Sequence, residues 1–336
     1  MTTAHPGTFR AFRIDKTEDR RYPRSVVERN VDDLPEGDLL VDVAYSSLNY
    51  KDALSATGNP GVTRNFPHTP GIDAAGTILE SASEDLPPGT EVIVIGFDLG
   101  MNTPGGFGQR IRVPARWAVP MPDGLDVRSS MILGTAGFTA ALSIDKLESA
   151  GMSADAGPVL VTGSTGGVGS VAVKLLAKLG YEVHAATGKA DRHDYLRDLG
   201  ANAIVSREEL LVRADRPLGR ETWGGVVDTV GGQILVNAVK SLRYGASAAA
   251  CGLVASAEIP ATVFPFILRH VNLLGIDSVE LPQAEKARIW SKLAGSWKLD
   301  GLEQLVAPLT MDTLSDAIDR ILAGDMVGRG LVDPNA

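Results

Sequence analysis

The stretch "VLVTGSTGGVGSVAVKLL", residues 159–176, constrains the fold of this chain more than any other segment. A short apolar run ends at Thr162, glycines stand at 163, 166, 167 and 169, and an amphipathic helical pattern follows. Glycines permit a tight turn and let the backbone approach a pyrophosphate, which the free N–H groups of a helix N-terminus can bind. A plain strand–helix turn is the alternative, but it needs fewer glycines. The order strand, glycine loop, helix therefore predicts a dinucleotide site.

The same stretch also fits the T-G-x-x-x-G-x-G loop of short-chain dehydrogenases. Two features oppose that interpretation. The loop lies in the middle of the chain, behind the length of a whole domain. The Tyr-x-x-x-Lys catalytic pair is also missing, because Tyr181, Tyr195 and Tyr244 have Ala, Leu and Ala four residues later.

The pattern around the loop predicts two domains of different class. From 127 to 278, apolar strand patterns alternate with helical ones, which predicts a doubly wound parallel sheet of the Rossmann type. Residues 1–126 are dense in proline and glycine and show short strand patterns, with one helical stretch at "NYKDALSAT", which predicts a β-barrel-like domain. Residues 279–336 hold two helical patterns and a final strand, and we assign them to the first domain.

The turn after the second strand of the predicted Rossmann domain indicates the cofactor. An NAD enzyme places an acid there for the ribose 2′-hydroxyl, and "HAATGKADRHDY" has none at 184–188. Thr187, Gly188 and Lys189 supply a hydroxyl, a backbone N–H and a cation instead, with Arg192 a turn later. These groups suit a 2′-phosphate, so we predict NADP(H). A basic solvated turn is the alternative.

Composition narrows the class of protein further. The chain has 336 residues, a net charge of -9 and one cysteine, Cys251, so an internal disulfide is impossible and nucleic acid is a poor partner. No uninterrupted apolar run approaches the ~18 residues of a membrane helix, and the first residues lack the apolar core of a signal peptide. We expect a cytoplasmic protein.

The five histidines show no paired ligand spacing, and His68 is expected to be a surface or loop residue, so no metal site is predicted.

The segment "SSLNYKDA", residues 46–53, allows two interpretations. Asn49 is a good helix N-cap, and Asp52 three residues later completes a capping-box-like pair. Alternatively, these polar groups form one wall of an active site. Both can hold if Asp52 serves the cap while Asn49 and Tyr50 face a cofactor.

Several motifs together resemble one known family. In chain order they are "SSLNYKDALSATG", "PGIDAAGT", "GTAGFTA", "VTGSTGGVGS", "CGL" and "PFILRHVNLLGIDSV". Over residues 10–335 the chain is similar to the acrylyl-CoA reductase (NADPH) branch of the medium-chain dehydrogenase/reductases, whose members are often called quinone oxidoreductases. The resemblance implies a GroES-like catalytic domain beside the Rossmann domain, a zinc-independent reaction, and an active site in the cleft between them.

The resemblance also implies roles for individual positions. Tyr50 is expected against the cofactor, and Leu253, after Cys251 and Gly252, at its nicotinamide end. The expected pyrophosphate-binding positions are Ser164, Thr165, Gly166, Gly167 and Val168. Thr187, Gly188 and Lys189 are expected to hold the 2′-phosphate. Lys189 stands where arginine is common in the family, and a lysine keeps the charge but loses the bidentate geometry of a guanidinium. Thr135 and Thr139 are expected to start and pack a helix, with a cofactor contact as the alternative.

The implied reaction is hydride transfer to the β-carbon of an α,β-unsaturated thioester. Charge then develops on the thioester oxygen, and a proton must reach the α-carbon. Asn49, Tyr50 and Asp52 are the expected catalytic groups. Arg64 is a candidate for the coenzyme A phosphates, with a solvated loop cation as the alternative. A quinone reductase and an NADPH-binding redox sensor with little turnover remain open. An apolar edge strand at "LLGIDSV" suggests a homodimer.

Overall fold

The computed structural model describes residues 7–212 and 216–336, and the chain divides into two compact units. One unit, here called the catalytic unit after the role expected from the sequence, comprises Met1–Thr135, Val279–Ser296 and Asp300–Ala336. The other, here called the cofactor unit for the same reason, comprises Ala136–Ser278 and Trp297–Leu299. The sequence placed the boundaries after residues 126 and 278. The first one lies instead within a helix, α2 (Val127–Ser149), which carries the chain from one unit into the other.

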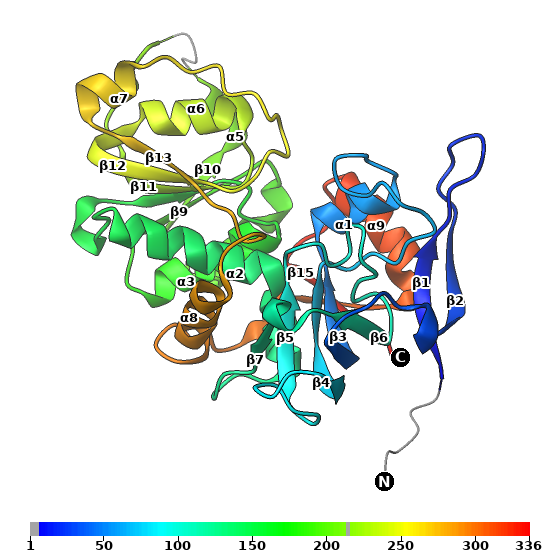
Figure 1. Ribbon diagram of the computed structural model, residues 1–336. Coiled ribbons are helices and arrows are strands. Elements are labelled where there is room, and N and C mark those ends of the chain that lie inside the picture. Colours follow the sequence, from blue (N-terminus) through cyan, green and yellow to red (C-terminus); the bar gives the residue numbers. More distant parts are fainter. Residues whose placement is uncertain (1–6, 213–215) are drawn as a thin grey trace. The chain divides into compact units, whose positions relative to one another are not determined.

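Strands of the catalytic unit form a mixed sheet and a hairpin (Figure 1). The sheet has the order β14-β15-β3-β4-β5-β7, and β6 also pairs with β3. Its strands are β3 (Leu39–Leu48), β4 (Asp73–Ser81), β5 (Glu91–Ile95), β6 (Arg110–Val113), β7 (Ala118–Pro120), β14 (Val306–Thr310) and β15 (Arg329–Asp333). The hairpin pairs β1 (Thr8–Ile14) with β2 (Arg24–Asn30), and the helices are α1 (Tyr50–Ala56), α8 (Gln283–Ala294) and α9 (Leu314–Leu322).

Alternation of apolar residues explains how this sheet buries one face. Leu39, Val41 and Val43 of β3 are fully buried, and they pack with alternating residues of β4, β5 and β6 in one core cluster. The C-terminal strand β15 then pairs antiparallel with the end of β3, so Leu331 lies opposite Ser47. This pairing brings the tail of the chain beside the "SSLNYKDA" segment.

The cofactor unit is a six-stranded parallel sheet in the order β10-β9-β8-β11-β12-β13. Its strands are β8 (Val159–Val161), β9 (Val183–Thr187), β10 (Ala203–Ser206), β11 (Trp223–Asp228), β12 (Leu242–Ala250) and β13 (Asn272–Gly275). The connecting helices are α3 (Gly167–Lys178), α4 (His193–Asp198), α5 (Arg207–Leu211), α6 (Gly232–Lys240) and α7 (Phe264–Arg269). Figure 1 shows α5 and α6 on one side of the sheet and α3 on the other. This strand order is that of the Rossmann fold, which the sequence predicted.

Helix α2 is apolar and 23 residues long, which is enough to cross a membrane by length and composition. However, 78% of its most apolar window is buried inside the protein, as expected of a core helix. The helix is interrupted at Gly134, whose φ of 51° and ψ of -160° are not helical.

Candidate functional site

The glycine loop of the cofactor unit lies between β8 and α3. Gly163 has a φ of 60°, and a Cβ there would overlap the Thr229 hydroxyl, while a Cβ on Gly169 would overlap the Gly163 carbonyl. Glycine is therefore required at both positions. Helix α3 begins at Gly167 after Gly166 as N-cap, without a side-chain capping bond. The N–H groups of its first turn remain available to an anion, which fits a dinucleotide pyrophosphate.

A buried carboxylate fixes this loop from the neighbouring strand. Asp228, at the end of β11, accepts hydrogen bonds from the Thr162 hydroxyl at 2.7 Å and from the Gly231 N–H at 2.8 Å. The Thr162 oxygen in turn accepts the Thr229 N–H at 3.0 Å. Burial raises the pKa of Asp228, and the bonds from Thr162 and the backbone oppose that rise. The pair Thr162–Asp228 thus joins the ends of β8 and β11 beneath the glycines.

The predicted 2′-phosphate turn follows β9. Thr187 is buried, and its hydroxyl accepts the Lys189 N–H at 3.0 Å, which fixes a tight turn with Gly188 exposed between them. A Cβ on Gly188 would lie 2.9 Å from Arg207 Nη2. Arg207 begins α5 directly after β10, and Ser206 of β10 lies opposite Thr187 in the parallel register. A guanidinium that the sequence did not single out therefore reaches the same turn.

The segment after β12 lies against Asp228 and Thr229, at the end of β11. The Cys251 N–H donates to the Asp228 carbonyl at 3.0 Å, and burial raises the pKa of the Cys251 thiol to about 12, so this thiol is a poor nucleophile. A Cβ on Gly252 would overlap the Thr229 carbonyl. Leu253 is 58% exposed, so its apolar side chain is open to a ligand.

A second polar cluster lies inside the catalytic unit, around Asp73 at the start of β4. Its carboxylate accepts hydrogen bonds from the Ser47 hydroxyl, from Asn49 Nδ2 at 2.8 Å and from the Thr135 N–H at 2.9 Å. Arg329 of β15 lies 3.9 Å from this carboxylate and donates to Asn49 Oδ1 at 3.3 Å. The Asn49 amide thus bridges a buried acid and a buried base, with both ends of the amide occupied.

Asp52 takes part in the start of α1, as the capping interpretation predicted. Its carboxylate accepts the N–H groups of Asn49 at 2.8 Å, Gly71 at 3.0 Å and Ile72 at 2.8 Å. Burial first, and the Asp73 charge second, raise the pKa of Asp52 to about 7, against the opposing effect of these bonds. A fully buried carboxylate with three backbone donors has a structural role, and its position gives no support to direct catalytic contact.

The remaining predicted residues differ in exposure. Tyr50 is half-buried at the first position of α1, and Arg64 is exposed, with Nε donating to the Pro60 carbonyl at 3.3 Å.

The expectation of a surface position for His68 is wrong. Its side chain is 4% exposed, and its Nε2 lies 2.9 Å from the Gly100 carbonyl, because the segment pairs with β1 through Ile14. The Thr139 hydroxyl donates to the Ser278 hydroxyl at 3.0 Å. The Asp73 carboxylate accepts the Thr135 N–H at 2.9 Å and so caps the second part of α2.

Sequence reasoning missed Asp73, Arg329, Asp228 and Arg207 as site residues. An acid at the start or end of an apolar strand, as in "PGIDAAG" and "VVDTVG", was the available signal for two of them. Arg329 carried no local signal, since its partners lie near the other end of the chain. Across residues 7–212 and 216–336, no group of three or more His, Cys, Asp or Glu side chains could hold a metal ion.

Comparison with known proteins places this geometry in a family. The family model described as alcohol dehydrogenase GroES-like domain matches residues 35–123, and the one described as zinc-binding dehydrogenase matches residues 167–294. The acrylyl-CoA reductase AcuI of Ruegeria pomeroyi is 47% identical over 98% of this chain and 100% of its own length. The chain belongs to the acrylyl-CoA reductase branch of the medium-chain dehydrogenase/reductases. The predicted GroES-like and Rossmann fold class is thereby confirmed.

Two solved structures are similar to this chain over nearly its whole length. The YhdH oxidoreductase of Salmonella enterica, in complex with NADP, is 43% identical with a TM-score of 0.93, and the match covers 96% of this chain and 99% of that one. The YhfP protein of Bacillus subtilis, with NAD bound, is 40% identical with a TM-score of 0.95, and the match covers 98% of this chain and 100% of that one.

Proposed function

We propose that the protein is an NADPH-dependent reductase of the activated C=C bond of an α,β-unsaturated thioester, of the acrylyl-CoA to propionyl-CoA type. The observation that carries this proposal is the similarity to a reductase of that name, which is 47% identical over 98% of this chain. A second relative, named as the probable acrylyl-CoA reductase AcuI of Escherichia coli, is 44% identical over 90% of the chain. The enzyme would act on CH–CH groups without zinc.

The cofactor in this proposal is NADP(H). The glycine loop and the first turn of α3 would hold the pyrophosphate, through Ser164, Thr165, Gly166, Gly167 and Val168. Thr187, Gly188 and Lys189 would hold the 2′-phosphate. Two observations support this assignment: the Arg207 guanidinium lies beside Gly188, and no acid stands at residues 184–188. Cys251, Gly252 and Leu253 would line the nicotinamide end, with the exposed Leu253 as the contact.

When bound, NADPH supplies a hydride from the nicotinamide ring. The chain's own contribution is to orient the substrate and to stabilise charge on the thioester oxygen. Tyr50 is the half-buried polar group at the start of α1. The Asn49 side chain donates to Asp73 and accepts from Arg329, which fixes the backbone next to Tyr50. Asn49 and Asp52 therefore act in this proposal by positioning. Arg64, exposed on its loop, remains the candidate for the phosphates of coenzyme A.

The test compares the rates of NADPH oxidation with acrylyl-CoA and with 1,4-benzoquinone. We expect acrylyl-CoA to give the higher kcat/KM and propionyl-CoA to accumulate. A rate with acrylyl-CoA no faster than the background would end the reductase proposal. Tyr50→Phe and Tyr50→Ala extend the test, since loss of the hydroxyl or the ring should lower turnover or NADPH affinity with an unchanged melting temperature.

A quinone oxidoreductase is the second candidate. The putative quinone oxidoreductase YhfP of Bacillus subtilis is 41% identical over 96% of this chain, so identity alone separates the two activities poorly. Faster turnover of the quinone than of the thioester would favour it. An NADPH-binding redox sensor predicts tight binding and no turnover with either compound.

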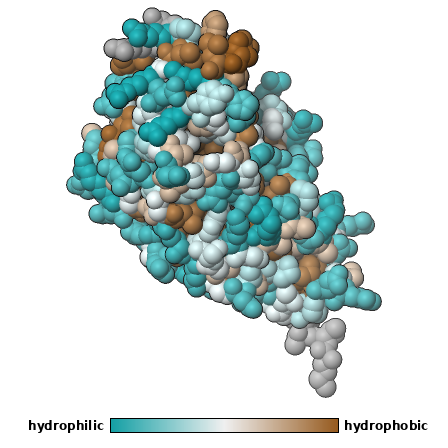
Figure 2. Space-filling view, turned by 90° about the vertical axis from the view of Figure 1, so that its left-hand side faces the viewer, coloured by the Kyte–Doolittle hydropathy of each residue, from teal (hydrophilic) through white to brown (hydrophobic). Residues whose placement is uncertain are grey.

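We also propose a cytoplasmic homodimer that forms through the edge of the Rossmann sheet. Strand β13 ends the sheet order, and it has no second partner strand within the described chain. Helix α7, which leads into β13 and contacts β12, exposes large apolar side chains together with the residues before it. Figure 2 shows an apolar area at the top of the face it draws. These exposed residues, here called the α7 patch, are Ile259, Val263, Phe264, Ile267 and Leu268. An unpaired edge beside an apolar patch favours association between copies.

A further inference from the structure

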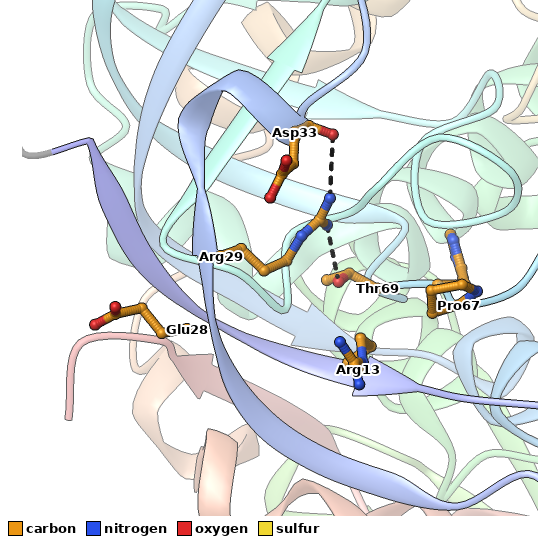
Figure 3. A pocket seen from close by; sticks show the side chains of 7 residues that line it. Arg13, Glu28, Arg29, Asp33, Pro67 and Thr69 are labelled. Atoms are coloured by element: carbon orange, nitrogen blue, oxygen red, sulfur yellow. Dashed lines mark hydrogen bonds between the residues drawn. The ribbon is translucent and has the colours of Figure 1, made fainter.

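A pocket of about 270 Å³ opens in the catalytic unit, between the β1–β2 hairpin and the segment before β4 (Figure 3). It is lined by Arg13, Glu28, Arg29, Asp33, Pro67, His68 and Thr69. The segment before β4 forms one wall of the pocket, and it is held against β1 because Ile14 and His68 exchange backbone hydrogen bonds of 2.7 and 2.9 Å. None of the roles assigned to this unit uses the pocket.

The register of the hairpin brings its two arginines to one face. Arg29 lies opposite Phe9, and Arg13 lies opposite Ser25, so both side chains leave the hairpin on the face that carries Phe9. Glu28 lies opposite Arg10 and belongs to the other face. Figure 3 shows the Glu28 carboxylate directed away from Arg13, Arg29 and Thr69. The acid nearest in sequence to Arg29 therefore does not neutralise it.

The guanidinium of Arg29 is held by weak neutral acceptors. It donates to the Thr69 hydroxyl at 3.5 Å and to the Asp33 carbonyl at 3.3 Å, and its Cζ lies 5.9 Å from the Phe9 ring centroid. Within the part of the chain that the structure describes, no carboxylate comes within ion-pairing distance of it. Burial lowers the pKa of Arg29, and the charge of Arg13 lowers it further, while Asp33 raises it.

Arg13 is a second cation that lines the pocket. The Arg13 side chain is 38% exposed, and its guanidinium forms an ion pair with the partly exposed Asp15 at 3.0 Å. Arg13 can exchange Asp15 for another acceptor at little cost in free energy, since surface ion pairs contribute little to stability. The two guanidinium forks and the Thr69 hydroxyl thus offer several donors around one cavity.

We propose that this Arg13–Arg29 pocket binds a phosphate-class oxyanion, with Arg29 as the principal donor and Arg13 and Thr69 completing the site. Guanidinium forks match the tetrahedral oxygens of a phosphate and bind them with charge-assisted hydrogen bonds. The anion would compensate two neighbouring cations, one of which is half-buried. The ligand is either free phosphate or the phosphate of a larger molecule, and coenzyme A is the available candidate if the proposed function holds.

The experiment titrates orthophosphate into the full-length protein by calorimetry, at constant ionic strength. We expect binding to the wild type, and binding about 10- to 100-fold weaker in Arg29→Met, the range for one lost charge-assisted hydrogen bond. Arg29→Lys should give an intermediate loss, since the charge remains while the fork is lost. Arg21→Met, which removes an exposed arginine outside the pocket, is the control and should bind as the wild type does.

A second arm distinguishes the source of the phosphate. If it belongs to coenzyme A, removal of the 3′-phosphate and Arg29→Met should weaken binding of that ligand to the same extent. If the two forms of coenzyme A bind equally while orthophosphate binding is lost in Arg29→Met, the site takes a free anion. Orthophosphate that does not bind the wild type, or binds Arg29→Met equally well, would overturn the proposal. Acrylyl-CoA turnover is measured separately, so either proposal can fail alone.

Discussion

At the scale of single residues, the burial of Asp52 makes stability depend on pH. Its pKa in the folded protein is about 7, against 3.8 as the ordinary value, so the folded state holds this proton more tightly. The contribution to stability is therefore present at low pH and is lost as pH rises through about 7. Full loss would be on the order of 4 kcal/mol.

Asp52→Asn removes this titration. At pH 5 the variant should be less stable than the wild type by about 1–3 kcal/mol, because the amide cannot accept all three backbone N–H groups. At pH 8 the difference should shrink or reverse. Urea unfolding at both pH values measures it, with the exposed Asp123→Asn as control. An equal loss at the two pH values would mean that Asp52 does not titrate in this range.

Arg207 is the residue-scale test of cofactor choice. If its guanidinium, beside Gly188, binds the 2′-phosphate, Arg207→Met should lower kcat/KM for NADPH about 10- to 100-fold and leave that for NADH unchanged. Arg220→Met, at another exposed position of the same unit, should change neither value. Equal losses with both cofactors would show that Arg207 supports the fold and not the phosphate.

At the scale of elements, the interruption of α2 at Gly134 makes room for the Asp73 cluster. A Cβ there would lie 2.5 Å from Asp73 Oδ2 and 2.7 Å from Arg329 Nη2 and would overlap the Ser47 hydroxyl. The backbone also has dihedral angles that only glycine adopts easily. Gly134→Ala should cost about 2–5 kcal/mol and lower the melting temperature.

Gly151→Ala is the matched control for this change. Gly151 also has a positive φ, 95°, but no atom lies within 4 Å of its would-be Cβ, so only the backbone cost remains. Its melting temperature should lie between those of the wild type and Gly134→Ala. Equal losses in the two variants would assign the whole effect to the backbone, and none to the Asp73 cluster.

The elements that the sequence predicted well are those with a strong local pattern. The glycine loop, β8, β9, β11, β12 and the helices α8 and α9 all follow from apolar runs, glycines or helical periodicity. Strand β10 was missed because it is four residues long and mostly half-exposed. The β1–β2 hairpin, which carries Arg13 and Arg29, was missed because charged residues interrupt its alternation.

Site contacts that join distant segments could not be predicted in the same way. The Asn49–Asp73–Arg329 cluster depends on β15 pairing with β3, and Arg207 reaches Gly188 only through the register of β10 on β9. Local sequence predicted the N-cap at Asn49 but not that the amide side chain would bind Asp73 and Arg329. The burial of His68 likewise depends on its pairing with Ile14.

At the scale of the whole molecule, the free edge of the Rossmann sheet favours assembly. Antiparallel pairing of β13 with β13 of a second copy would continue the sheet and cover the α7 patch on both copies about a two-fold axis. Leu268 is 56% exposed in this patch, so Leu268→Glu should place charge in the interface without disturbing the fold. Light scattering should give the mass of a dimer for the wild type and of one chain for the variant. Leu211→Glu, on α5 outside the patch, should remain dimeric. A wild type with the mass of one chain at micromolar concentration would contradict the dimer.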